Sequence, residues 1–188
     1  AARLRLKLFR FGAPIALSEA LPMMENMGLR VLSEHPYEMA LGAGSRIFIQ
    51  DFEVQPQAGI SVDPEVVRDS FQAAFERTWR GEVENDGFNR LILSAQMNWR
   101  QVAMLRGYCK YLLQTGVPFS QMYMEEALNR YPQIARQLAE LFEAKFDPAR
   151  DQHALNLDIA SKALKPMLDG VASLDDDRIL RSFITVIH

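Results

Sequence analysis

The residues best suited to bind a metal or move a proton are the three histidines, His35, His153 and His188. A protein metal site usually combines such a histidine with further ligands at a short, regular spacing on one element. None of the three stands in a recognised metal-binding spacing. The sequence therefore predicts no metal site, and it favours a structural or surface role for His35, which lies in a predicted strand.

Two acidic runs, residues 82–86 and 175–177, have the residue types needed for acid–base or metal chemistry. Their positions favour charge at helix N-termini and solvated surface instead. Gly42 and Gly44 lack both the third glycine of a phosphate-binding loop and a following helix, so they predict a hairpin turn. We find no catalytic, cofactor-binding or metal-binding residues in the sequence.

Composition narrows the class of protein. Over 188 residues, hydrophobic residues make up 48% and charged residues 24%, which is typical of a soluble globular chain. A net charge of −3 argues against a nucleic-acid partner. No apolar run reaches the ~20 residues of a membrane span, and no signal peptide is evident. The single Cys109 lies on an apolar helix face, so we expect a buried, inert thiol in a reducing, cytoplasmic setting.

The first third of the chain predicts a βαββ unit. Residues 3–11 alternate leucines with Arg3, Arg5 and Lys7, as in a half-buried strand. The apolar phase then shifts at Phe9 and Phe11, which a bulge or a second covered face would explain. A short helix capped by Ser18 and ended by Gly28 follows, and then strands over 29–40 and 46–54. This order is most of the ferredoxin-like pattern.

The remainder of the chain predicts helices only. A fourth strand could come only from residues 91–94, and we assign these to a helix beginning near Asp86 instead. Residues 149–153 are expected to be a loop, and Pro166 with Gly170 is expected to kink or split the helix after it. The other predicted helices start at Asp63-Pro64, Asn98, Ser120, Pro132 and Ser173.

The helix over residues 98–116 is predicted to form the core of the helical part. Asn98 and Gln101 can form a capping box, and Gly116 can end the helix. Its apolar arc spans about 200°, which requires neighbours on two sides. The arc contains Val102, Leu105, Tyr108, Cys109, Leu112 and Leu113, widened by Met104 and Tyr111; the expected solvent edge contains Arg100, Arg106, Lys110 and Gln114.

Three stretches in this order, residues 16–39, 79–93 and 174–188, resemble the large multidomain bacterial NAD-specific glutamate dehydrogenases. The resemblance covers nearly the whole chain. It implies an α+β fragment, with an ACT/ferredoxin-like βαββ unit over 1–62 followed by an all-α region over 63–188 that leads to a catalytic domain. It also implies that the parent oxidises L-glutamate to 2-oxoglutarate and ammonia with NAD.

No stretch of this sequence matches the glycine-rich and lysine-bearing segments of the family's catalytic domain. The resemblance therefore implies no catalytic or cofactor-binding residue here, and an inactive fragment without a cofactor. The expected partners are other domains of the same polypeptide, and the parent is expected to be a homo-oligomer. The chain starts at Ala1 without an initiator methionine and ends at His188 without a helix cap, as expected of an excised fragment.

One possible ligand site follows from the resemblance to ACT modules, which commonly bind small amino-acid effectors at a strand-to-helix loop. The matching loop runs through Gly12, Ala13 and Pro14 to Ser18, where free helix N–H groups favour a carboxylate. Gly12 would permit close approach to the backbone. Against this, Gly and Pro are ordinary in loops and Pro22 removes a nearby N–H, so a purely structural packing role is the alternative.

Two functions in different classes follow from the sequence. The first is a regulatory and architectural fragment of the dehydrogenase. The second is a stand-alone small-molecule-sensing or scaffolding protein with an ACT-like unit. A native reading frame that continues past His188 into a glycine-rich oxidoreductase distinguishes the first from the second.

Overall fold

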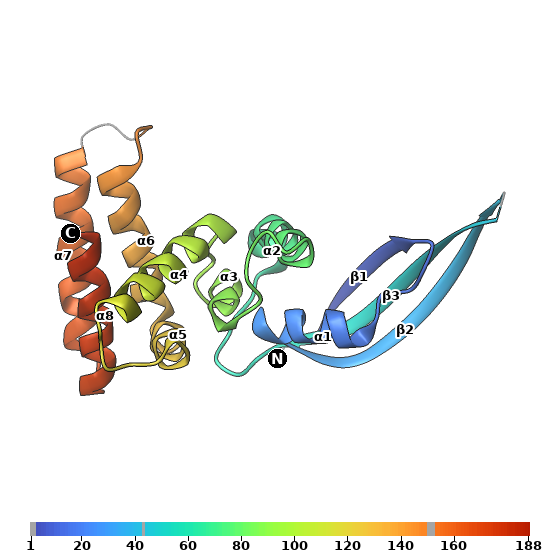
Figure 1. The fold of residues 1–188 in the computed structure, drawn as a ribbon, viewed down its shortest axis with the longest axis horizontal. Helices are drawn as coiled ribbons and strands as arrows, with labels where there is room; N and C mark the ends of the chain where they lie inside the picture. The colour runs from blue at the N-terminus through green and yellow to red at the C-terminus, as the bar shows by residue number, and fades with distance from the viewer. Residues whose placement is uncertain (1–2, 43, 150–152) are drawn as a thin grey trace.

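The computed structural model describes residues 3–42, 44–149 and 153–188 (Figure 1). A sheet region comes first, with β1 (Leu4–Phe11), α1 (Leu17–Asn26), β2 (Leu29–Gly42) and β3 (Ser45–Pro56). Helices follow: α2 (Pro64–Trp79), the 3₁₀ helix η1 (Gly87–Arg90), α3 (Leu91–Ser94), α4 (Trp99–Gln114), α5 (Gln121–Arg130), α6 (Pro132–Phe146), α7 (His153–Asp169) and α8 (Leu174–Ile187). This order confirms the predicted α+β class and its βαββ unit.

The sheet has the order β1-β3-β2, with β3 antiparallel to both neighbours. The register of β1 runs unbroken from Leu4↔Val54 to Phe11↔Ile47, which excludes the bulge as the explanation of the phase shift and leaves the second covered face. Register shifts occur in β2 instead. Within the described ranges the sheet has no fourth strand, and the Leu91–Ser94 segment is helical, as predicted.

Two of the predicted helix N-caps, Asn98 and Ser120, are confirmed, and in both the capping side chain bonds a backbone N–H within three residues of it. Asn98 accepts hydrogen bonds from the backbone of Arg100 and Gln101, and the Gln101 side chain completes the capping box. Ser120 accepts from the Tyr123 N–H, as predicted. Ser18 does not cap α1: the helix begins at Leu17 after Ala16, which has no side-chain cap bond.

The C-terminal helices differ from the prediction in two details. Helix α7 begins at His153, which the sequence placed in a loop; residues 150–152 of that predicted loop lie outside the described ranges. Pro166 lies inside α7, and the helix continues to Asp169, so of the two expected effects, a kink or a split, the split at Pro166 is excluded.

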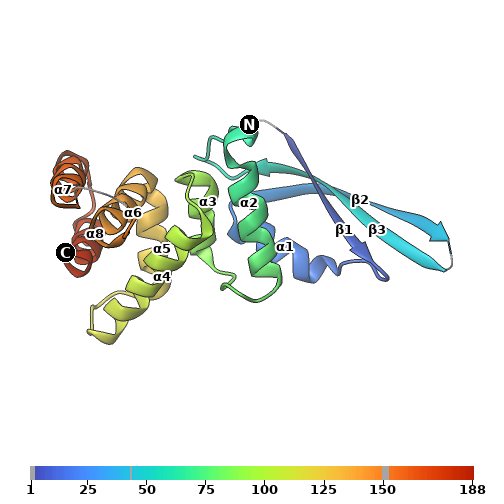
Figure 2. The same ribbon diagram turned by 90° about the horizontal axis from the view of Figure 1, so that it is seen from above.

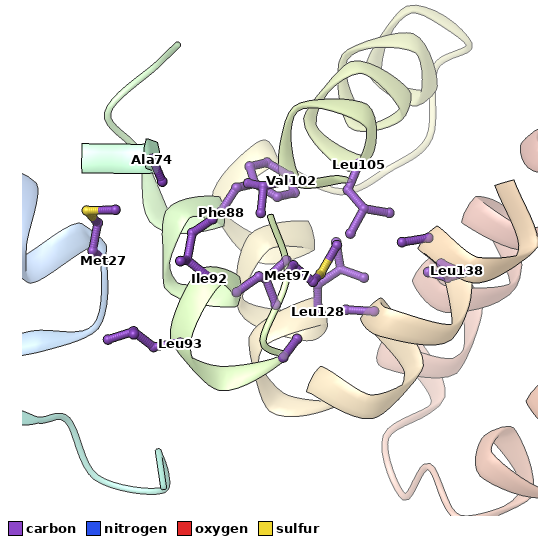
Figure 3. Close-up of a cluster of buried hydrophobic side chains, with 14 of the residues drawn as sticks. Met27, Ala74, Phe88, Ile92, Leu93, Met97, Val102, Leu105, Leu128 and Leu138 are labelled. Atoms are coloured by element: carbon purple, nitrogen blue, oxygen red, sulfur yellow. The ribbon is translucent and has the colours of Figure 1, made fainter. Parts of the chain in front are cut away.

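One buried core joins the sheet region to the helices (Figure 3). Met27 follows α1 and Ala74 lies on α2, and both are buried together with Leu93 of α3. The same core continues through Met97 and Leu105 into the helical region. Burial of this apolar surface stabilises both regions together.

The sheet extends away from the helical body. In Figure 1 and Figure 2 the strands reach outward from α1 and α2, which lie between the sheet and the other helices. One face of the sheet carries Phe52 and Val54, which are buried. The opposite face carries Phe9 and Phe11, which are 64% and 72% exposed, so nothing within the described chain covers that face at its far end.

Candidate functional site

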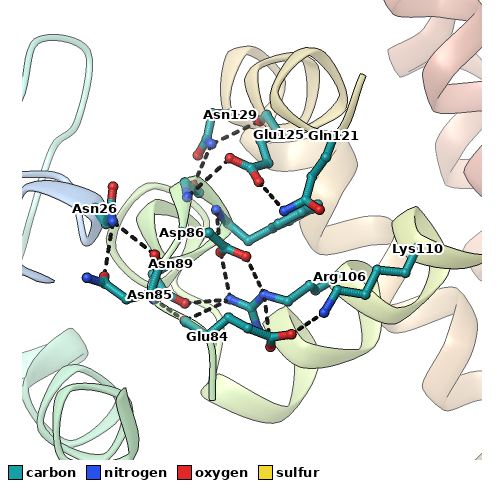
Figure 4. A network of polar contacts seen from close by, with 12 residues as sticks. Asn26, Glu84, Asn85, Asp86, Asn89, Arg106, Lys110, Gln121, Glu125 and Asn129 are labelled. Atoms are coloured by element: carbon teal, nitrogen blue, oxygen red, sulfur yellow. Dashed lines mark hydrogen bonds and ion pairs between the residues drawn. The ribbon is translucent and has the colours of Figure 1, made fainter. Parts of the chain in front are cut away.

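The most highly connected polar groups lie where residues 84–89 meet α4 and α5 (Figure 4). Arg106 of α4 forms a two-bonded pair with Asp86: Nε is 2.7 Å from Oδ2 and Nη2 is 2.8 Å from Oδ1. Nη2 also donates to Asn89 Oδ1 at 2.8 Å. Asp86 in turn caps η1 by accepting from the Phe88 N–H. This arrangement fixes the segment before α3 against α4.

Arg106 corrects the predicted solvent edge of α4. The residue is only 2% exposed, whereas the sequence placed it in water. Burial of a guanidinium is tolerated here because its hydrogen bonds end on a carboxylate and an amide oxygen. The exposed residues of α4 include Lys110, whose ammonium pairs with Glu84, and Tyr111, which was predicted to widen the buried arc.

Glu125 of α5 forms the other half of this polar cluster. Its carboxylate accepts hydrogen bonds from the Gly87 N–H at 3.1 Å and from Gln121 Nε2 at 2.8 Å. Burial raises the pKa of Glu125, and the hydrogen bond from Gln121 partly offsets this effect. A Cβ on Gly87 would meet Glu125 Oε2, so a larger residue at this position would displace the Glu125 carboxylate from its hydrogen bond with the Gly87 N–H.

The charges of Glu84, Asp86, Arg106 and Lys110 are matched within this cluster, which indicates a structural role. Asp86 and Glu84 are engaged by Arg106 and Lys110, and the hydrogen bond from Lys110 lowers the pKa of Glu84. Nearby Cys109 is buried as predicted, and burial raises the pKa of its thiol to about 12, far from a reactive thiolate.

Both acidic runs lie at helix N-termini as predicted, but each includes a residue that pairs with an arginine and is largely withdrawn from the predicted solvated surface. Asp86 is engaged as described, and Asp176 is 2% exposed and pairs with Arg130 through bonds of 2.9 and 2.6 Å. Neither partner is near in sequence, so no local pattern indicated the pairing. Within the described ranges, no cluster of three or more His, Cys, Asp or Glu side chains is arranged to hold a metal ion.

The loop predicted to bind an effector is open to solvent. Gly12 has φ +86°, its N–H donates to the Arg46 carbonyl at 3.0 Å, and it lines a hollow of about 520 Å³ at the end of the sheet. Ala13, Pro14 and Ser18 are exposed and do not line that hollow. The structure thus brings only Gly12 of the four predicted residues to a concave surface.

Comparison with known proteins identifies the two regions. Residues 1–67 match the family described as glutamate dehydrogenase, ACT3 domain, and residues 83–148 match glutamate dehydrogenase, helical motif 3. The NAD-specific glutamate dehydrogenase of Halomonas elongata is 44% identical over 182 residues, covering 97% of this chain and 11% of the relative. The chain is similar to a segment of NAD-specific glutamate dehydrogenase.

Two further relatives agree with this result. The NAD-specific glutamate dehydrogenases of Pseudomonas aeruginosa and Mycobacterium tuberculosis are 40% and 39% identical, each over 98% of this chain. The chain spans only about 12% of the length of either. It therefore corresponds to a small part of these glutamate dehydrogenases. Among the described residues, no helix is long and apolar enough to cross a membrane.

The polar cluster connects the two regions matched by the glutamate dehydrogenase families. Asn26 in the ACT3 match donates to the carbonyl oxygen of Asn85 at 3.2 Å and to its side-chain oxygen at 3.0 Å. Asn85, Asp86 and Arg106 all lie within the helical motif 3 match. These hydrogen bonds thus connect the region that matches the ACT3 family to the region that matches helical motif 3.

Proposed function

We propose that this chain is a non-catalytic, architectural and regulatory part of a cytoplasmic NAD-dependent glutamate dehydrogenase. In this proposal the parent converts L-glutamate and NAD to 2-oxoglutarate, ammonia and NADH, with the reaction carried out elsewhere in the polypeptide. The names of the relatives and the small share of their length that the chain covers support this division. The alternative of a stand-alone sensing or scaffolding protein does not account for that small share.

The observation that carries the architectural role is an apolar patch on the free face of the sheet. Two neighbouring rungs of the sheet are apolar on all three strands at this face. One rung joins Phe9, Ile49 and Tyr37, and the next joins Phe11, Ile47 and Met39. Residues on the same face nearer the helices are polar, so the apolar character is confined to the outer end.

The patch is large enough to be an interface. Phe9, Phe11 and Tyr37 are 64%, 72% and 54% exposed. At roughly 200 Å² for each fully exposed ring, these three side chains leave about 400 Å² of mostly apolar surface in water. Patches of about 300–600 Å² are the largest that ordinary monomers carry, and they are often functional.

We assign this patch to another part of the same polypeptide. About nine tenths of each relative's length lies outside the region that this chain matches, so ample chain is present to cover it. The polar rungs beside the patch are largely neutralised, because Arg5 bonds Asp51 at 2.7 Å and Arg3 bonds Glu53 at 2.7 Å. The surface therefore favours an apolar partner face over a strongly charged ligand.

Hydroxyl-radical footprinting of the full-length enzyme and of the 188-residue chain tests this assignment. We expect the oxidation of Tyr37 and Met39 to fall at least several-fold in the full-length enzyme, because a packed side chain is shielded from solvent radicals. Tyr111 is the matched reference, since it is 53% exposed against 54% for Tyr37 but lies on α4.

Equal oxidation of Tyr37 in the two proteins would show that the patch stays open and would contradict the assignment. If the protection instead arises in the isolated chain and grows with its concentration, a second copy is the occupant. Sedimentation velocity over the same concentrations separates these two outcomes.

The chain is expected to be catalytically silent by itself. Its sequence has no stretch that matches the cofactor-binding segments of the family's catalytic domain. NADH formation from glutamate and NAD should equal the no-protein control, and calorimetry should detect no saturable binding of NAD. Turnover above that control would place catalytic residues in this chain and contradict the division proposed above.

The effector loop through Gly12, Ala13, Pro14 and Ser18 remains part of the regulatory proposal. Its support is limited to the positive φ of Gly12 and the hollow that Gly12 lines. A chemical-shift titration of the 188-residue chain with a panel of amino acids tests this site, because binding there would shift resonances of residues 11–20.

A further inference from the structure

The side of α4 that faces away from the common core carries a second stripe of uncharged residues. Met104, Gly107, Tyr108 and Tyr111 recur at spacings of three and four residues, which places them on one face of the helix. This face borders a groove of about 670 Å³, here called the α4 groove. Its other lining residues are Phe142 of α6 and Thr185 and Val186 of α8. Among the described residues that line the groove, none is charged.

The α4 groove lies on the part of the predicted apolar arc that the described chain does not cover. The sequence predicted an arc of about 200° on α4, which requires neighbours on two sides. Val102, Leu105 and Leu112 fill one side of the arc and are buried in the common core. Tyr108 and Tyr111 lie on the other side, where Tyr108 is only partly buried and Tyr111 is exposed. The described residues therefore provide one of the two neighbours that the arc requires.

Three packed helices give the α4 groove its shape. Helices α4, α6 and α8 all contact one another. The ring of Phe142 meets that of Tyr108 edge to face, with centroids 6.0 Å apart. The exposed ring of Phe146 lies 5.0 Å from that of Phe142, so the apolar surface continues along α6. The walls of the groove are thus held by the same packing that forms the helical region.

Gly107, in the middle of the stripe, is not explained by the described chain. Glycine is less favourable than alanine in the interior of a helix, so its presence there needs a reason. The backbone of Gly107 is helical and does not have the positive φ that favours glycine. A Cβ at this position would meet no atom within 4 Å, so no described neighbour excludes a side chain. The missing Cβ therefore makes room for a group from outside the described residues.

We propose that the α4 groove binds the apolar face of a helix from another part of the parent polypeptide. Helices pack by fitting rows of side chains into the grooves of their neighbours, and a glycine at the crossing lets the two backbones come close. The uncharged lining favours an apolar face, since a charged group would lose its hydration there without gaining a partner. About nine tenths of each relative's length lies outside the region that this chain matches, so enough chain is present to supply the helix.

This inference rests on the proposed function, in which the chain is one part of a longer enzyme, but it concerns a different surface from the apolar patch. The α4 groove lies in the helical region, whereas the patch lies at the outer end of the sheet. An open groove would leave the patch assignment and the catalytic silence of the chain standing. An open patch would likewise leave the groove unaffected, because each surface is measured at its own residues.

Hydroxyl-radical footprinting of the full-length enzyme and of the 188-residue chain measures the groove at Tyr111 and Met104. In the isolated chain, Tyr111 should be oxidised as readily as Tyr37, which it matches in exposure. In the full-length enzyme, we expect the oxidation of Tyr111 and Met104 to fall at least several-fold. Met122 is the reference for this comparison, because it is 66% exposed on α5 and lines neither the groove nor the patch.

Substitution of Gly107 separates an external role of this glycine from an internal one. In the 188-residue chain, Gly107→Ala should raise the midpoint of urea unfolding, because alanine is the better helix former and its Cβ meets nothing. In the full-length enzyme, Gly107→Leu should raise the oxidation of Tyr111 several-fold, because the partner backbone can no longer approach. Gly107→Ala should act in the same direction and provides the test if Gly107→Leu does not fold.

Gln72→Leu is the control for these variants. It adds an apolar side chain at an exposed position on α2, outside the α4 groove. The oxidation of Tyr111 in the full-length enzyme should be the same with and without this substitution.

Photo-cross-linking of the full-length enzyme identifies the occupant. With p-benzoylphenylalanine in place of Tyr111, we expect cross-links to residues outside the 188-residue region that are spaced three or four apart, as on one face of a helix. Cross-links to alternate residues would indicate a strand, and cross-links within the 188-residue region would indicate a second copy. Either result would contradict the proposal.

Three outcomes of the other measurements would also overturn it. Equal oxidation of Tyr111 in the two proteins would show that the groove stays open in the enzyme. A lower urea midpoint for Gly107→Ala in the isolated chain would show that the glycine is needed within the segment itself. Protection of Tyr111 that appears in the isolated chain and grows with its concentration would make a second copy the occupant.

Discussion

Replacing Arg106 by methionine is expected to lower the free energy of unfolding by about 3 kcal/mol, as for other broken buried ion pairs. The methionine keeps most of the volume but leaves Asp86 and the buried Asn89 Oδ1 without their donor. An unpaired carboxylate at 17% side-chain exposure is only partly solvated, so water cannot replace the lost bonds fully. Urea unfolding followed by circular dichroism measures the change.

Lys110→Met is the matched control, one helical turn further along α4. Lys110 and its partner Glu84 are 49% and 52% exposed at their side chains, and such surface pairs contribute about 0–1 kcal/mol. Equal losses for the two variants would mean that the Arg106 pair is worth no more than a surface contact. That result would remove the polar cluster as the connection between α4 and residues 84–89.

The second large effect is expected from Leu105→Ala, at about 2–5 kcal/mol. Leu105 is fully buried, with 0% exposure, where α4 meets the shared core. Truncation removes apolar contacts and leaves a cavity that the surrounding helices can close only in part. Leu112→Ala should behave in the same way, because Leu112 is 3% exposed. The midpoint of urea unfolding reports both.

Leu113→Ala provides the control with identical chemistry. Leu113 was predicted to lie in the buried arc, but it is 38% exposed, so its truncation should cost about 1 kcal/mol or less. If Leu113→Ala destabilises the chain as much as Leu105→Ala, the exposed side of α4 is covered in solution. Comparable small losses for all three leucines would contradict the central position of α4.

What could be predicted from the sequence depended on how far apart the interacting residues are. The caps at Asn98 and Ser120 were correct because donor and acceptor lie within three residues of each other. The burial of Arg106 could not be foreseen, because its partner Asp86 is 20 residues away and no periodic pattern connects the two. Ser18 failed for a local reason: the chain turns into α1 two residues earlier, at Ala16.

The hollows on the surface show the same dependence on how far apart their residues lie in the sequence. Gly12 was found because glycine after a strand is a local signal, and its positive φ agrees with that signal. By contrast, a cavity of about 560 Å³ beside Arg90 is lined by the connector after β3, by η1 and α3, and by α5, so only the folded chain brings its residues together.

The sequence did indicate that the face of β1 carrying Phe9 and Phe11 is unusual. The shift in the apolar phase at these residues predicted either a bulge or a second covered face, and the unbroken register of β1 excludes the bulge.

The residues between the two family matches determine how freely the two matched regions can move relative to each other. Residues 68–82 fall outside both matches, yet most of them form α2, whose Phe71, Ala74 and Phe75 are buried in the common core. A flexible hinge between modules would place small, solvated residues at such a boundary. Here the boundary is a helix that is packed into the common core, so no solvated hinge separates the sheet from α3 and α4. We therefore expect the two matched regions to reorient together as one body and not about a hinge between them.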